Sequence, residues 1–116
     1  HGREEAGSYQ VRSGLRKLLT DPHVSVRIEA AAVLASVEDP APSLELLTKE
    51  LRHQRVEARL HAMRALELMG GAARQMIPVI TKARDEAIRR TDEHPCWMFV
   101  RFSAEAALEQ LQRSHE

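Results

Sequence analysis

The sequence predicts an all-α protein of stacked helical hairpins, and three observations support that fold class. The first is a recurring segment in which an arginine leads into a helix rich in Ala and Leu. It occurs at residues 24–34, 56–66 and 98–108. The second is the spacing of its arginines, Arg27, Arg59 and Arg101, which lie 32 and 42 residues apart, close to the period of helical-hairpin repeats. The third is composition: 43% of residues are apolar but only 3% are aromatic, so Ala and Leu must fill a core between closely spaced helices.

The first expected hairpin pairs a helix over residues 8–20 with one over residues 22–37. The earlier helix carries an apolar stripe at helical spacing. Asp21 and Pro22 favour the start of the later helix, because Asp accepts free backbone N–H bonds at an N-cap and Pro fits the first helical position. The chain begins with His1 and not Met, which either a tag remnant or excision from a larger protein would explain, and we favour a fragment of a larger protein. Residues 1–7 are expected to be a disordered end or the remnant of a tag.

Glycine and proline bound the remaining expected helices. Gly70 and Gly71 favour a helix end, and Pro78 has to lie in the first turns of the helix that contains it. The remaining helices are expected over residues 42–53, 55–69, 72–91 and 95–113. Six helices in three antiparallel pairs then form one repeat domain over residues 8–113. Its hairpins are expected at residues 8–37, 42–70 and 72–113.

Charge and composition argue against several classes of partner. Lys and Arg together number 17, as do Asp and Glu, so the chain lacks the positive charge that drives binding to a phosphate backbone. No apolar run approaches the roughly 20 residues needed to span a bilayer. One cysteine rules out an internal disulfide but leaves the compartment open. We expect a protein partner or a further domain of the same protein, no nucleic acid, membrane or cofactor, and a monomer or weak dimer.

Aligning the three recurring segments shows why their positions have these residue types. Leu34, Leu66 and Leu108 supply a large buried side chain at the same place in each segment. Alanine occupies another place in all three, at residues 30, 62 and 104. A small residue there lets the first helix of each hairpin approach closely.

The repeated arginine has two possible roles. A buried arginine needs a partner, so Arg27, Arg59 and Arg101 form either a structural ladder or a row that binds anions. In the ladder, each guanidinium bonds a carboxylate or a carbonyl of an adjacent turn. We favour the ladder, because the position recurs with the fold and not with other ligands. Asp21 is the acid expected to partner Arg27.

The segment from Asp21 to Leu34, DPHVSVRIEAAAVL, resembles HEAT repeats, including the short HEAT-like repeats of bilin-lyase type. The resemblance covers residues 8–113 and implies a right-handed α-solenoid of about three hairpins. It also implies that the second helices of the hairpins line one face, on which partners bind. By alignment, the residues on that face are Glu29, His61, Arg64, Glu67, Ser103 and Gln110.

A narrower resemblance is to the HEAT-like segment that follows the catalytic domain of some planctomycete sulfatases. Residues 65–78 and 100–111 carry it. The Cys/Ser-x-Pro-x-Arg nucleophile motif of sulfatases is absent, so this parentage implies an accessory domain that performs no hydrolysis. It also implies export to the periplasm or beyond, whereas a free-standing scaffold would be cytoplasmic. An enzyme acting on a bilin or on nucleic acid is a third reading.

Each remaining residue that could carry chemistry also has a purely structural explanation. The six histidines form no set at zinc-ligand spacing, and solvated loop positions explain them better than a metal site. Cys96 is either a small buried hydrophobe or a reactive thiol at a helix start. Trp97, Met98 and Phe99 either close the core or form an exposed anchor. With no catalytic constellation, the sequence favours a non-catalytic module for protein–protein or interdomain interaction.

Overall fold

The computed structural model describes the backbone of residues 2–113 and the side chains of residues 9–113. Over this range the chain is helical and contains no β-strand, which confirms the all-α prediction. The α-helices are α1 (Gly2–Leu18), α2 (Val24–Val37), α3 (Ala41–Glu50), α4 (Val56–Met69), α5 (Ile77–Arg89) and α6 (Cys96–Arg113). A 3₁₀ segment, η1 (Gly70–Met76), joins α4 to α5.

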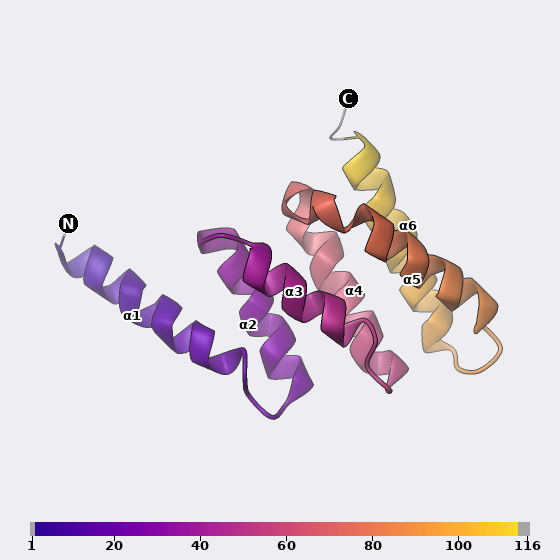
Figure 1. Cartoon of the computed structure of the whole chain (residues 1–116), viewed down its shortest axis with the longest axis horizontal. Coiled ribbons are helices and arrows are strands. Elements are labelled where there is room, and N and C mark those ends of the chain that lie inside the picture. Colours follow the sequence, from indigo (N-terminus) through magenta and orange to yellow (C-terminus); the bar gives the residue numbers. More distant parts are fainter. Residues whose placement is uncertain (1, 114–116) are drawn as a thin grey trace.

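The helices follow one another along the longest axis of the molecule, whose extents are 53 × 38 × 17 Å. Helices α2, α4 and α6 lie side by side, with α4 packed against both of the others. Helices α3 and α5 cross in front of that layer (Figure 1). Helix α1 packs against α2 at the N-terminal end. The fold is therefore two helices deep, which accounts for the short 17 Å dimension.

One apolar core runs from α2 to α6 between the two layers. The aligned leucines and alanines both belong to the buried interior: Leu34, Leu66 and Leu108 are at most 5% exposed, and Ala30, Ala62 and Ala104 at most 3%. A second, smaller cluster surrounds Trp97 at the start of α6. Burial at these positions follows from the recurring pattern, since small and large residues alternate along the contact surface.

The first hairpin differs from expectation at its turn. Helix α1 begins at Gly2, whereas the apolar stripe favoured a start near residue 8. Helix α2 begins at Val24 with His23 as the N-cap, so the expected capping role of Asp21 is wrong. Asp21 Oδ1 instead accepts the backbone N–H of His23 at 2.8 Å. The acid thus closes the turn before the helix and leaves the helix N-terminus without a side-chain cap.

The segment after α4 is wound more tightly than expected. An α-helix over residues 72–91 was expected, but residues 70–76 are 3₁₀ and α5 begins at Ile77. Gly70 ends α4 with a φ of +60°, a conformation that side chains other than glycine rarely adopt. Pro78 lies in the first turn of α5, where its missing N–H costs no hydrogen bond. Because the 3₁₀ segment interrupts the α-helical winding, α4 and α5 can lie in positions that one continuous α-helix would not allow.

Candidate functional site

Polar side chains join the helices of the α2, α4 and α6 layer into one continuous surface, called here the inner face. His61 Nε2 on α4 lies 2.8 Å from Glu29 Oε1 on α2. Ser103 Oγ on α6 donates to Glu67 Oε1 on α4 at 2.8 Å. Four of the six residues expected on this face are therefore in contact, in pairs that cross from one helix to the next.

The other two expected residues, Arg64 on α4 and Gln110 on α6, are exposed. Apolar side chains accompany them: Leu68 is 87% exposed and Val33 is 47% exposed. Leu68 follows Arg64 by one helical turn, a spacing that places both on the same side of α4. Neither apolar residue was predicted from the sequence, although the spacing from Arg64 was a signal for Leu68.

A small notch lies on this face between α2 and α4. Its volume is about 160 Å³, and alanine side chains of both helices form most of its wall. Leu68 stands at its edge. An exposed leucine beside a shallow apolar depression is a suitable contact point for an apolar side chain of another protein.

Arg27 connects three segments of the chain at the other side of this layer. Its Nη1 donates to the backbone carbonyl of Asp21 at 2.8 Å, and its Nε donates to Glu50 Oε2 at the end of α3 at 2.9 Å. The carboxylate partner is therefore Glu50 and not the expected Asp21. Glu50 is only 3% exposed, so this ion pair is largely removed from water. A signal for Glu50 existed: it lies one turn from Leu47, on the buried side of α3.

Arg59 repeats this arrangement one hairpin later. Its Nε donates to the carbonyl of His53 at 2.6 Å, and its Nη1 donates to Glu86 Oε2 on α5 at 3.0 Å. Each arginine therefore bonds a carbonyl six residues earlier and a carboxylate of the helix that follows. These contacts match the structural ladder, and the guanidinium groups of Arg27 and Arg59 already have anionic partners within the protein.

Trp97 extends the Arg59 contact into a cluster that joins α4, α5 and α6. The guanidinium carbons of Arg59 and Arg90 lie 5.2 and 4.3 Å from the ring centroid. Arg90 Nη1 also donates to Glu86 Oε2 at 3.0 Å. Burial alone would raise the pKa of Glu86, but the hydrogen bonds and charges of Arg90 and Arg59 outweigh it and lower the pKa below its ordinary value.

Arg101 departs from the ladder. It pairs with Glu105 of its own helix at 3.2 Å, on a surface where both side chains are about 40% exposed (43% and 39%). Arg27 and Arg59 are the fourth residues of α2 and α4, whereas Arg101 is the sixth residue of α6. The extra half turn carries Arg101 away from the carbonyls that precede its helix. The expectation that all three arginines make equivalent contacts is therefore wrong for the third.

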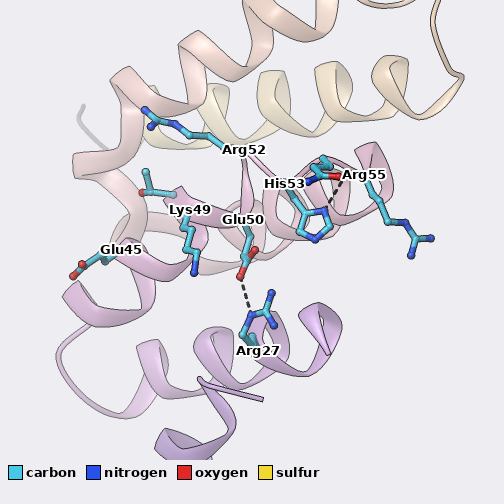
Figure 2. A pocket seen from close by; sticks show the side chains of 9 residues that line it. Arg27, Glu45, Lys49, Glu50, Arg52, His53 and Arg55 are labelled. Atoms are coloured by element: carbon cyan, nitrogen blue, oxygen red, sulfur yellow. Dashed lines mark hydrogen bonds and ion pairs between the residues drawn. The ribbon is translucent and has the colours of Figure 1, made fainter. Parts of the chain in front are cut away.

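A wide hollow lies where α3 turns into α4 (Figure 2). It has a volume of about 890 Å³ and is lined mainly by charged side chains, among them Arg27, Lys49, Glu50, Arg52 and Arg55. Figure 2 shows Arg52 and Arg55 pointing in opposite directions, so these two cations do not converge on one point. Arg27 in the same hollow is already paired with Glu50.

Two histidines, His53 and His94, and Cys96 lie at or beside turns between helices. His53 Nδ1 accepts the backbone N–H of Arg55, and His94 Nδ1 accepts that of Cys96, each at 3.0 Å. They close the turns before α4 and α6, as Asp21 does before α2. Cys96 is partly buried beside Trp97. Among the side chains of residues 9–113, no group of three or more His, Cys, Asp or Glu is placed to hold a metal ion.

The tryptophan segment divides between its two expected roles. Trp97 is 4% exposed, in agreement with a core role, whereas Met98 is 39% and Phe99 43% exposed.

None of the described helices is long and apolar enough to cross a membrane. Comparison with protein-family models, with curated proteins and with solved structures found no match to this chain.

Proposed function

We propose that the chain is a non-catalytic module that binds a protein partner, or a further domain of the same protein, on its inner face. In this proposal the hairpins are turns of a right-handed α-solenoid. The observation that carries it is the continuity of the inner face, where Glu29–His61 and Glu67–Ser103 bridge successive helices. A surface braced in this way presents a fixed shape to a partner, and less entropy is lost on binding.

The exposed residues of the inner face indicate the chemistry of the partner. Leu68 and Val33 offer apolar contacts, and the exposed Arg64 offers a positive charge beside them. An aliphatic side chain with an acidic neighbour would complement this group. Such mixed surfaces are typical of interfaces between proteins that also exist apart.

The pairing of the polar groups supports a binding role over catalysis. Ser103 donates its hydroxyl proton to Glu67, and His61 contacts Glu29. A nucleophilic serine and its histidine base need a hydrogen bond to each other. The Ser103 hydroxyl and the His61 ring are instead paired with Glu67 and Glu29. The pairs therefore serve the surface rather than a reaction.

Site-specific photo-crosslinking in the cells that make this protein tests the proposal. Leu68 is replaced by benzoylphenylalanine, with Ile88 on α5 as the matched control, since Ile88 is also exposed at 44%. We expect a discrete adduct from position 68 that disappears when Arg64→Glu is added, and no equivalent adduct from position 88. Adducts from position 88 alone, or an adduct at 68 that Arg64→Glu leaves unchanged, would contradict the proposal.

A further inference from the structure

Helix α6 exposes the flank that is covered in the two preceding members of its layer. This flank, called here the α6 flank, consists of Met98, Arg101, Phe102 and Glu105. Met98 is 39% and Phe102 50% exposed. Arg101 and Glu105 form the half-exposed pair described above. The apolar side chains of Met98 and Phe102 thus share this flank with Arg101, whose carboxylate partner belongs to the same helix.

The equivalent flanks of α2 and α4 are largely covered, with Val24 on α2 and Leu60 on α4 partly buried. Ile28 on α2 aligns with Phe102 and is fully buried, as is Ala31, which aligns with Glu105. On α4, Val56 aligns with Met98 and is 8% exposed, and Met63 aligns with Glu105 and is fully buried. The α6 flank therefore corresponds in the sequence to surfaces of α2 and α4 that the following helix contacts.

The structure contains two examples of what covers such a flank. Over α2 the cover is α3, which brings the aliphatic residues Leu44 and Leu47 to the core and places Glu50 on Arg27. Over the arginine of α4 the cover includes α5, which places Glu86 on Arg59. In both cases the acid lies in the last turn of the covering helix. Over α2, aliphatic packing and an arginine–carboxylate contact occur together. Over α4, Val56 packs with Ala87 of α5 and Trp97 of α6, beside the Arg59–Glu86 contact.

We propose that the α6 flank binds an amphipathic helix of a partner protein, with aliphatic residues at helical spacing and an acidic residue in its last turn. The aliphatic side chains cover Met98 and Phe102. The acid contacts Arg101 and takes the place of Glu105. The end of the bound helix that carries the acid lies near the start of α6, as the end of α3 lies near the start of α2. This proposal does not depend on the inner face, which involves other residues.

Charge argues against a second copy of this chain as the occupant. Glu50 precedes Arg59 by nine residues, and Leu18 precedes Arg27 by the same number. Helix α1 therefore has leucine where α3 has the acid. Its last turn also carries Arg16 and Lys17, which would repel Arg101. A partner helix with an acidic residue in its last turn would complement the charge of Arg101, which α1 would not.

The covering helix of this chain provides the probe. A fluorescent peptide of residues 40–53 contains the α3 stripe and Glu50, and a lactam between Glu45 and Lys49, both exposed in α3, holds it helical. We expect saturable binding to the full chain by fluorescence anisotropy. Arg101→Glu should weaken binding about tenfold, the effect of roughly 1.4 kcal/mol. A peptide with Glu50→Arg should recover affinity for the Arg101→Glu protein.

Phe102→Asp provides a second variant that does not depend on the charge pair, and it should abolish binding. Circular dichroism melts establish that both variants are folded. The proposal is overturned if no binding occurs up to about 1 mM peptide. It is also overturned if both variants bind like the parent chain, because the peptide is then exchanging with α3. Dimerisation in sedimentation equilibrium that Phe102→Asp removes would assign the flank to a second copy and overturn the proposal as well.

Discussion

Buried guanidinium groups hold neighbouring hairpins together because each one bonds two segments besides its own helix. Arg27 joins the turn before α2 to the end of α3, and Arg59 joins the turn before α4 to α5. The Arg27–Glu50 pair is deeply placed, with side-chain exposures of 21% and 4%. Removal of one partner of such a pair leaves a charge without compensation, which is far more costly than loss of a surface pair.

Neutralising Glu50 should therefore destabilise the protein much more than neutralising Glu105. We expect Glu50→Gln to lower the free energy of unfolding by about 2–4 kcal/mol. Glu105→Gln breaks an exposed pair within one helix and should cost less than about 0.5 kcal/mol. Urea denaturation followed by circular dichroism measures both. Equal losses of unfolding free energy in the two variants would show that burial of the Arg27–Glu50 pair adds nothing to stability.

Alanine at the aligned position sets the distance between helices. Ala62 is fully buried, and no neighbour can move without disturbing the shared core. Ala62→Leu should overpack this contact and lower the free energy of unfolding by about 1–3 kcal/mol. Leu68→Ala, at an exposed position of the same helix, is the control and should change it by less than about 0.5 kcal/mol. An unchanged urea midpoint for Ala62→Leu would argue against the alignment.

Single helices differ in how firmly they are held. Helix α1 packs mainly on α2, whereas α4 contacts α2, α3, η1 and α6. Fewer neighbours mean fewer buried contacts to stabilise α1 against local opening. Its amides should accordingly exchange with solvent faster than those of α4.

Gly14 weakens α1 further, because glycine gains more backbone freedom on unfolding than alanine does. A Cβ atom at this position would meet nothing within 4 Å. Gly14→Ala should therefore stabilise α1 by about 0.5–1 kcal/mol. The measurement is amide hydrogen exchange of residues 9–18, which should slow in the variant while α4 is unaffected. Amide exchange of residues 9–18 that is as fast as in the parent chain, or faster, would contradict the prediction.

The contact of α5 with α4 should weaken in acid. The pKa of Glu86 is lowered from 4.5 by Arg90 and Arg59 against the opposing effect of burial. A lowered folded-state pKa contributes stability that is present above the unfolded value and is lost as the pH falls through the folded one. The loss therefore begins below about pH 4.5.

Trp97 reports on this contact, since it is the only tryptophan and lies against both arginines. Its emission during urea unfolding at several pH values should show stability falling as the pH drops below about 4.5. Glu86→Gln should reduce that dependence and lower stability at neutral pH. If the variant kept the full pH dependence of the parent chain, other carboxylates would be responsible.

The molecule as a whole carries no net charge, and Arg52 and Arg55 at the hollow between α3 and α4 point in opposite directions. Non-specific DNA binding depends on the release of counterions by clustered cations. We expect no retention of duplex DNA on the immobilised protein at about 0.15 M salt. A gel-shift titration over salt concentration provides an independent measurement. Retention that weakens steeply with salt would indicate a nucleic-acid partner in place of a protein.

Local signals account for the parts of the fold that were predicted from the residues. Gly70 and Gly71 marked the end of α4, and the recurring leucines and alanines marked the buried sides of three helices. Asp21 was misassigned because its carboxylate has two competing uses, a helix cap and a turn. It closes the turn by bonding His23, since α2 starts later than Pro22 suggested.

From the residues alone one can assign the helical class, the approximate helix ends and the positions that repeat. Those features depend on periodicity and on contacts within a few residues. The partners of the arginines are different, because Glu50 and Glu86 lie 23 and 27 residues from Arg27 and Arg59. Only the packing of one hairpin on the next brings these groups together. The same packing buries Ile28 and leaves Phe102 on the surface, because no described helix follows α6 to cover it.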